Sequence, residues 1–230
     1  MWILDIQKLK KSFPTAEGEE RLIVDVEHFR LEAGSETALA GESGSGKTTF
    51  LHLISGVLKP DSGQIDLNGT SMETLSEAGR DRLRAGVLGY VFQNFNLLQG
   101  MTALENVELA MRFGGGIDPG RAKLLLNRMG LSNRLHHYPR QLSMGQQQRV
   151  AVARALANHP KLVLADEPTA HLDHVRGLEA VTLIREVCRE FGATLLLVSH
   201  DQEILSHFQN VQHFEKLNRA LHSSSKAVKA

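Results

Sequence analysis

The segment that most constrains the fold is Gly41-Glu42-Ser43-Gly44-Ser45-Gly46-Lys47-Thr48. It fits the pattern Gly-x-x-x-x-Gly-Lys-Ser/Thr, in which a glycine-rich loop binds phosphate groups. The mostly apolar residues 37–40 before it predict a short buried strand, and residues 49–55 carry apolar side chains at helical spacing. Because strand, loop and helix follow in the order that the motif requires, we expect an α/β fold built around a phosphate-binding loop.

The residues of this loop indicate its chemistry. Its glycines allow backbone conformations that other residues resist, so successive N–H groups can surround an anion at the start of a helix. Lys47 is expected to reach the β- and γ-phosphates of a nucleotide, and the Thr48 hydroxyl to bind Mg²⁺. The alternative interpretation, a glycine-rich turn followed by a surface lysine, is disfavoured by the surrounding strand and helix.

Composition limits the class of molecule. A chain of 230 residues that is 42% hydrophobic can form one domain with a sizeable core. Its 26 basic and 26 acidic residues cancel, so no overall attraction to nucleic acid or anionic lipid is expected. The one cysteine, Cys188, is expected to be buried filler in a helix, which suits a reducing cytoplasm. Because no apolar run approaches the length of a membrane span, we expect any action at a membrane to require a partner.

The N-terminal part of the chain is predicted to contain antiparallel strands. Residues 2–40 read as strands with turns around Gly18 and Gly34. The strand at 64–67 is followed by Asn68-Gly69, a hairpin-type turn. The next elements are expected to be a polar helix and a strand, at residues 76–85 and 87–92.

The rest of the chain predicts a helical insertion and then a parallel sheet. Thr102 and Glu105 form a capping box at the start of one helix, and Asp118-Pro119 begins another, which Gly130 ends. Strands alternating with helices imply parallel pairing, and they are expected at 161–165, 193–198 and 211–217, with helices at 174–190 and 201–207. The predicted organisation is a single domain whose parts are a nucleotide-binding core with a β subdomain (1–93 and 158–222), a helical subdomain (94–157) and a frayed tail (223–230).

Polar side chains suited to phosphate chemistry follow the predicted strands. The apolar strand at 162–165 leads into Asp166 and Glu167, at the end of a parallel strand where ligands bind. Asp166 is expected to hold Mg²⁺, and Glu167 to polarise the attacking water. His200 follows another strand and could reach a γ-phosphate. Gln93 also follows a strand, and its amide could bind Mg²⁺ or position water. The alternative is that these residues only mark where strands reach solvent.

These segments, in this order, resemble the nucleotide-binding subunit of ABC transporters over nearly the whole chain. The similar segments are Gly41–Thr49 for the Walker A loop, Gln93 for the Q-loop, Leu142–Gln146 for the signature motif, Leu162–Asp166 for Walker B with Glu167 as catalytic base, Ala170–Asp173 for the D-loop and His200 for the switch histidine. Phe13 matches the position where the family stacks an aromatic ring on adenine, and a core aromatic is the alternative.

The resemblance implies a P-loop NTPase fold with a mainly parallel core sheet, and an ATPase that uses ATP and Mg²⁺. Metal ligands implied by it are Thr48, Gln93 and Asp166. ATP bound to one copy would meet Ser143, Gly145 and Gln146 of a second copy, so a head-to-tail homodimer is implied in the ATP state.

Two residues depart from the family pattern. Met144 replaces the usual glycine of the signature motif, and His171 stands in the D-loop where a small or amide residue is commoner. The contacts expected from Ser143, Gly145 and the helix N-terminus survive the first change. The second is expected to affect contacts between subunits.

Residues 93–98, 102–107 and 164–169 most resemble the ATPases of lipoprotein-releasing and macrolide-export systems. That resemblance implies a subunit on the cytoplasmic side of the inner membrane, held there by a permease that sets the substrate, with no nucleic-acid partner. The apolar stretch Phe95–Met101 is a candidate for binding the permease's cytoplasmic helix, and ordinary core packing is its alternative.

Two other functions share part of this pattern. An ATPase that signals across the membrane, as in cell-division systems, has every motif, and only the partner's identity discriminates it. A soluble ABC ATPase of DNA repair would need a coiled-coil or zinc-binding insertion, which the helical segment, without heptads or cysteines, does not provide.

Overall fold

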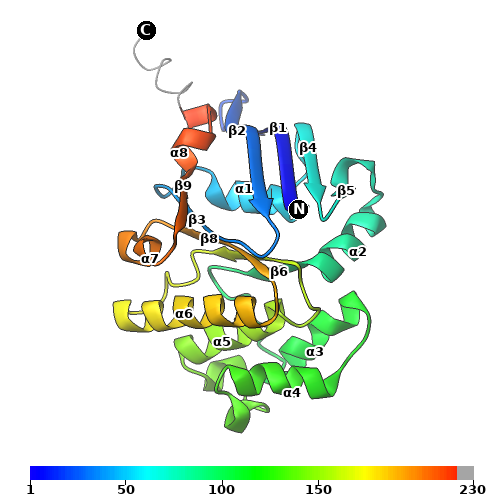
Figure 1. Ribbon diagram of the computed structural model, residues 1–230, viewed down its shortest axis with the longest axis vertical. Coiled ribbons are helices and arrows are strands. Elements are labelled where there is room, and N and C mark those ends of the chain that lie inside the picture. Colours follow the sequence, from blue (N-terminus) through cyan, green and yellow to red (C-terminus); the bar gives the residue numbers. More distant parts are fainter. Residues whose placement is uncertain (222–230) are drawn as a thin grey trace. The chain divides into compact units, whose positions relative to one another are not determined.

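The computed structural model describes residues 1–221 (Figure 1). The chain forms two compact units, one made of Met1–Arg80 with the chain from Val198 onward and the other of Asp81–Leu197. The tail predicted at 223–230 lies outside the described residues. The predicted three-part division of the domain stays a prediction.

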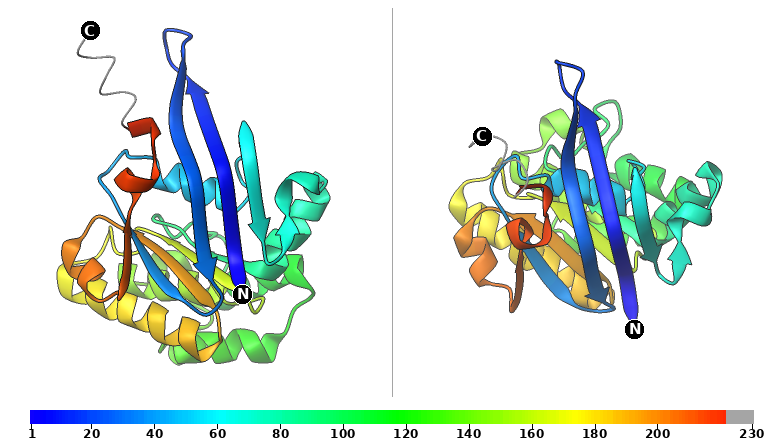
Figure 2. Two further views of the ribbon diagram at one scale, coloured as in Figure 1. Left: turned by 45° about the horizontal axis from the view of Figure 1, so that its top comes forward. Right: turned by 90° about the horizontal axis from the view of Figure 1, so that it is seen from above.

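An antiparallel sheet forms the N-terminal part of the first unit. Its strand order is β2-β1-β4-β5, and β1 and β2 run side by side along their whole length (Figures 1 and 2). Asn68 and Gly69 have φ of 50° and 75°, which is the left-handed pair that a two-residue hairpin turn needs, so the predicted hairpin is confirmed. The strands are β1 (Trp2–Pro14), β2 (Glu20–Glu32), β4 (Ser62–Leu67) and β5 (Thr70–Ser71).

The phosphate loop belongs to the same unit. It connects β3 (Glu36–Ala40) to α1 (Lys47–Ile54), and β3 pairs in parallel with β9 (Asn210–His213). The helices α7 (Gln202–Ser206) and α8 (Phe214–Leu217) complete the unit.

The predicted strand over 211–217 is wrong in its second half, because β9 ends at His213 and α8 follows. Phe214 and Asn218 are both fully buried, whereas Lys216 between them is exposed. A strand would place all three residues on one face, so this pattern fits a helical turn. The Phe214 ring lies 5.3 Å from that of Phe50 in α1. Packing of Phe214 therefore stabilises a helical turn where the local sequence resembled a strand.

The second unit contains parallel strands and most of the helices. Strand β7 lies between β6 and β8 and pairs in parallel with β6. Helices α3, α4 and α5 pack on one another, and α6 packs on α5 (Figure 1). The strands are β6 (Leu88–Val91), β7 (Leu162–Asp166) and β8 (Thr194–Ser199), and the end of β8, from Val198, belongs to the first unit. The helices are α2 (Glu77–Val87), of which the part up to Arg80 belongs to the first unit, α3 (Ala103–Gly114), α4 (Pro119–Arg128), α5 (Met144–Ala155) and α6 (His174–Glu190). Short 3₁₀ turns lie at Met72–Thr74, Ser132–Arg134 and Pro139–Gln141.

Local capping rules set where the helices begin. The Thr102 side chain accepts the Glu105 N–H at 3.3 Å, and the Glu105 carboxylate accepts the Thr102 N–H at 2.7 Å. Asp118 accepts the Arg121 N–H at 2.9 Å, with proline at the first helical position. Both predicted helix starts are confirmed. Among the described residues, no helix is long and apolar enough to cross a membrane.

Candidate functional site

The phosphate loop has the backbone that its glycines predict. Gly44 and Gly46 have φ of 78° and 98°, in the left-handed region that glycine favours. A Cβ at Gly46 would also lie only 3.1 Å from the Ile23 carbonyl oxygen, so both conformation and space require glycine there. Glu42, Ser43 and Gly44 are exposed, whereas Ser45 is buried. The middle of the loop therefore lies on a surface that an anion can reach.

Lys47 is buried at the first position of α1, yet its ammonium group lies on the loop itself. Its Nζ donates to the carbonyl oxygens of Gly41 at 2.8 Å and Glu42 at 2.5 Å. Thr48 is exposed and Thr49 half-buried in the same helical turn. The loop thus holds a positive charge and a hydroxyl beside its exposed backbone, which is the donor set that a magnesium-bound polyphosphate requires.

Asp166 and Glu167 follow β7 as expected. Asp166 is buried at the end of the strand, and the side chain of Tyr90 in β6 lies beside it. Burial, and then the charge of the Asp166 carboxylate, raise the pKa of the Tyr90 hydroxyl well above its usual range, so Tyr90 stays neutral. Sequence reasoning missed Tyr90, although its place in the neighbouring strand was a usable signal.

Glu167 has an unusual backbone. Its φ is 43°, in the left-handed region that non-glycine residues rarely adopt and that clusters at functional sites. The peptide between Pro168 and Thr169 is held by the signature helix, because the buried Gln148 amide of α5 donates to the Pro168 carbonyl at 2.6 Å. Sequence reasoning did not single out Gln148. The side chain of Glu167 itself is half-buried.

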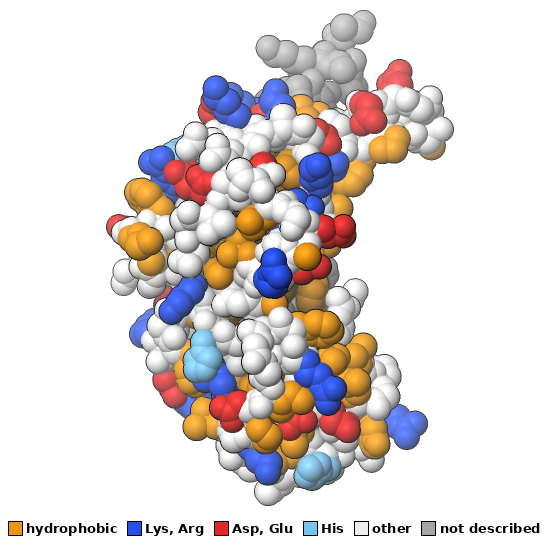
Figure 3. Space-filling view, turned by 90° about the vertical axis from the view of Figure 1, so that its right-hand side faces the viewer, with side chains coloured by type: hydrophobic (Ala, Val, Ile, Leu, Met, Phe, Trp, Pro, Cys, Tyr) orange, Lys and Arg blue, Asp and Glu red, His pale blue; other side chains and the backbone are white. Residues whose placement is uncertain are grey.

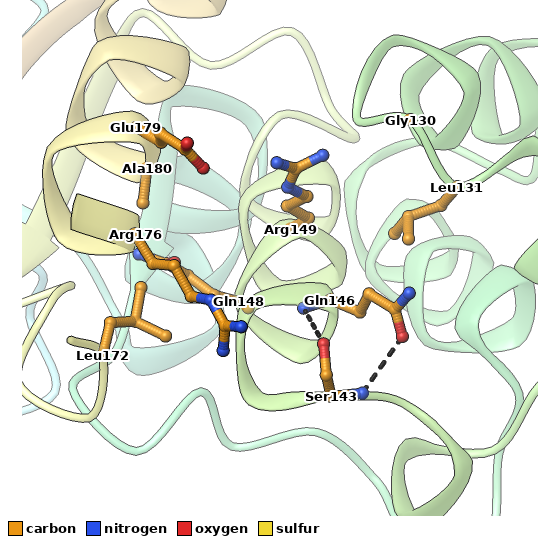
Figure 4. A pocket seen from close by; sticks show the side chains of 11 residues that line it. Gly130, Leu131, Ser143, Gln146, Gln148, Arg149, Leu172, Arg176, Glu179 and Ala180 are labelled. Carbon is orange, nitrogen blue, oxygen red and sulfur yellow. Dashed lines mark hydrogen bonds between the residues drawn. The ribbon is translucent and has the colours of Figure 1, made fainter.

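The signature motif begins α5 and borders a cavity of about 280 Å³ (Figure 4). Ser143 is the N-cap: its hydroxyl accepts the Gln146 N–H at 3.3 Å, and the Gln146 side chain accepts the Ser143 N–H at 3.0 Å. Met144 is 44% exposed and does not line the cavity. Residues that do line it include Ser143, Gly145, Gln146, Arg149 and Arg176. Glu179 also lines the cavity, and Arg176 pairs with Asp173 at 3.3 Å. The helix N-terminus and Arg149 are therefore the features that favour an anionic ligand there.

The segment after Gln93 is held from two sides. Gln93 is exposed, two residues beyond the end of β6. Its neighbour Asn94 forms a 2.8 Å hydrogen bond with Nε2 of His171, whose ring also meets Phe95 edge-on at 6.1 Å. His171, unusual for a D-loop, thus contacts the Q-loop segment of its own chain. Arg154 of α5 donates to the carbonyls of Phe95 and Asn96, both at 2.6 Å.

The remaining expected site residues lie in the first unit. His200 follows β8 and is exposed. Phe13 is half-buried near the end of β1, with Lys11 Nζ 5.5 Å from its ring centroid, so part of the ring remains accessible. Phe13, His200 and the phosphate loop belong to one unit, and Gln93, Asp166, Glu167 and the signature motif to the other. Among the residues described, no cluster of three histidine, cysteine, aspartate or glutamate side chains could hold a metal by itself.

Comparisons with known proteins agree with this set of motifs. The family profile described as ABC transporter matches residues 24–170. The ABC transporter ATP-binding protein YtrE of Bacillus subtilis is 40% identical over 212 residues, which cover 89% of this chain and 91% of YtrE. The lipoprotein-releasing system ATP-binding protein LolD of Shewanella oneidensis is 40% identical over 205 residues, 88% of this chain and 89% of LolD. The dimeric post-hydrolysis structure of the ATP-binding cassette MJ0796, bound to ADP and Pi, has a TM-score of 0.84 at 33% identity and covers 94% of this chain and 95% of that one. The chain therefore belongs to the ABC transporter family, as an ATP-binding domain that has the P-loop NTPase fold and hydrolyses ATP.

Proposed function

We propose that this chain is the ATPase subunit that powers a separate membrane permease, in the export or extraction of a lipoprotein or another hydrophobic substrate. The observation that carries the proposal is its likeness to a lipoprotein-releasing system ATP-binding protein, over 88% of this chain and 89% of that protein. The chain would act on the cytoplasmic side of the inner membrane, bound there through the permease.

The phosphate-binding part of the mechanism uses the first unit. The exposed N–H groups of the loop and Lys47 bind the phosphates of ATP, and Phe13 stacks on adenine. Thr48, Gln93 and Asp166 are the residues that would hold Mg²⁺, which supplies charge neutralisation at the transferring phosphate. His200 contacts the γ-phosphate.

Hydrolysis is assigned to Glu167. Its carboxylate accepts a proton from the attacking water, and the Tyr90 hydroxyl beside Asp166 stays neutral. The left-handed backbone at Glu167 and the Gln148 bond to the Pro168 carbonyl restrict the direction in which the carboxylate leaves the strand. This arrangement supports the role of base.

ATP acts between two copies of the chain. The phosphates bound to one copy contact Ser143, Gly145 and Gln146 at the start of α5 in the other, where the helix N-terminus and the arginine beside it favour an anion. Because only ATP carries the γ-phosphate that bridges the copies, ATP favours the closed dimer more than ADP does. A solved cassette similar to this chain is also dimeric.

The permease is proposed to bind a groove of about 480 Å³ in the second unit. The stretch Phe95–Met101 divides: Phe95 and Leu97 are buried, whereas Leu98 is 45% exposed. The exposed ring of Phe113 and the stacked pair Tyr90 and Phe92 offer a larger apolar surface. Groove residues include Arg84, Tyr90, Phe92, Ala110, Phe113 and Asn158. Tyr90 also lies beside Asp166, so a helix seated in this groove would touch a residue next to the catalytic strand.

Charge gives no support to a nucleic-acid partner. Acidic and basic side chains are interspersed over the face drawn in Figure 3, as the balanced composition predicts. A nucleic-acid surface needs a basic patch or stripe.

Replacing Glu167 with glutamine tests the mechanism. The Glu167→Gln protein should lose ATP turnover and accumulate as an ATP-bound dimer in sedimentation velocity, whereas the exposed control Glu17→Gln should behave as wild type. Turnover at the wild-type rate would remove Glu167 from the role of base. In parallel, Lys47→Ala should weaken ATP binding; unchanged affinity would contradict the assignment of the loop.

The partner is tested by isolating the tagged chain from membranes and identifying the protein that accompanies it. A permease whose ATP-dependent transport needs this chain supports the proposal. A partner that controls cell-wall hydrolases would favour the signalling alternative, which shares every motif.

A further inference from the structure

The segment Phe214–Asn218 contacts the phosphate loop and its helix at three points. Phe214 is fully buried, with its ring 5.3 Å from that of Phe50 in α1 and an edge atom 3.6 Å from the place where a Cβ at Gly46 would lie. This packing fixes α8 against the end of the loop. Two polar residues that follow this anchor, Glu215 and Asn218, contact the loop directly.

Glu215 holds the first peptide of the loop. Its Oε1 accepts the Glu42 N–H at 2.7 Å and would lie 2.9 Å from a Cβ at Gly41, so the carboxylate rests on this peptide. The carbonyl of the same peptide, Gly41 C=O, accepts Lys47 Nζ at 2.8 Å. One peptide group is therefore held at its N–H by Glu215 and at its oxygen by the lysine that binds phosphate.

Asn218 ties the middle of the loop to the antiparallel sheet. It is fully buried, and its Nδ2 donates to the Ser45 carbonyl at 3.2 Å and to the Ile23 carbonyl at 2.8 Å. Its Oδ1 accepts the Asp25 N–H at 2.8 Å. The donors and the acceptor of this amide are all used, so the loop carbonyl has a fixed position relative to β2.

We propose that α8 and Asn218 pre-organise the phosphate loop, and that Glu215 is a positioning residue for ATP binding. The inference rests on the assignment of residues 41–49 as the ATP-binding loop. Fixing the Gly41–Glu42 peptide fixes the oxygen on which the Lys47 ammonium lies, so the loop loses less freedom when phosphate arrives.

The hydrogen bond and the charge of Glu215 predict opposite results. A carboxylate near a polyphosphate repels it, so a purely electrostatic role would make ATP bind more tightly when the charge is removed. A positioning role needs only an acceptor for the Glu42 N–H, which a glutamine oxygen also provides. The variants Glu215→Gln and Glu215→Ala therefore separate the two roles.

The test is the ATP affinity of the full chain, measured by titration calorimetry. Glu215→Ala should weaken binding by about three- to tenfold, the equivalent of one lost hydrogen bond. Glu215→Gln should stay within about twofold of wild type, as should Lys216→Ala, which alters an exposed neighbour on the same helix. Hydrogen exchange without nucleotide should show faster exchange of residues 42–46 in Glu215→Ala only.

Several results would overturn the inference. They are wild-type affinity in Glu215→Ala, tighter binding in Glu215→Gln, or equal loss in the Gln and Ala variants. If the Ala variant does not fold, Glu215→Asn, which is too short to reach Glu42, takes its place with the same expectations. A wild-type chain that binds no ATP would instead contradict the proposed function, while the exchange measurement would still decide whether Glu215 holds the loop.

Discussion

Replacing Arg154 with methionine should destabilise the turn that follows Gln93. Arg154 extends from α5 and donates one hydrogen bond to each of the carbonyls of Phe95 and Asn96, at 2.6 Å. These two residues have φ of 56° and 49°, a left-handed conformation that side chains with a Cβ adopt at a cost. Burial lowers the pKa of Arg154, but a guanidinium remains charged at neutral pH. Methionine keeps the apolar stem and removes both donors.

The expected loss follows from these contacts. A hydrogen bond to a charged group contributes about 1.5–3 kcal/mol. The bond to Phe95 is partly buried and is assigned about 2 kcal/mol, whereas the bond to Asn96 is exposed and is assigned about 1 kcal/mol. Once released, the turn can relax and recover about 1 kcal/mol of the backbone strain. The free energy of unfolding should therefore fall by about 2 kcal/mol.

Urea unfolding followed by circular dichroism measures this loss. Arg112→Met, which alters an exposed arginine of α3, should change the free energy of unfolding by less than about 0.5 kcal/mol. Hydrogen exchange of residues 94–98 should increase in Arg154→Met and not in the control. An Arg154→Met protein as stable as the control, or with unchanged exchange at 94–98, would refute the reasoning.

Three further changes have defined outcomes. Gly63→Ala places a Cβ 2.5 Å from a backbone carbonyl of β1 at a φ of 102°, so urea unfolding should show a loss of more than about 2 kcal/mol, whereas Gly100→Ala, in open space, should change little. Asp61 accepts a hydrogen bond from Lys11 at 2.7 Å and another from the Ser12 N–H, and these bonds lower the pKa of its carboxyl group. The Asp61 carboxylate therefore stabilises the fold at pH values above its unfolded pKa of about 4. This stabilisation is lost as the pH falls through the lower pKa of the folded state. The stability deficit of Asp61→Asn should accordingly shrink between pH 6 and pH 3, as followed by urea midpoints. Ser143→Ala removes the cap of α5 and should cost about 1 kcal/mol in thermal unfolding, with weaker ATP-driven dimerisation in sedimentation.

Local rules explain which elements the sequence predicts well. The helix starts at Thr102 and Asp118 depend on side chains three residues from the N–H groups that they cap, so the signal is complete within one turn. The turn at Asn68-Gly69 likewise needs only two residues. The strand predicted to 217 failed because the burial of Phe214 depends on Phe50, far away in the chain.

The same distinction applies to the candidate site. The glycine loop and the Asp-Glu pair are contiguous, so their chemistry is visible in a short window. Glu215 lies 173 residues from the Glu42 N–H that it accepts, and Gln148 lies 20 residues from the Pro168 carbonyl. No periodicity or spacing rule connects such pairs, since they meet only through the fold.

Helix α5 links three of the motifs through contacts along its length. Ser143 at its start forms one wall of the cavity proposed to receive the partner's ATP. Gln148 in its middle holds the carbonyl of Pro168, the residue after Glu167, and Arg154 near its end holds the turn after Gln93. A helix of 12 residues is about 18 Å long and moves as a rigid rod on the scale of these contacts. A displacement of α5 on binding a second copy would therefore change the support of the proposed catalytic carboxylate and of the segment after Gln93 together, because α5 contacts both regions directly.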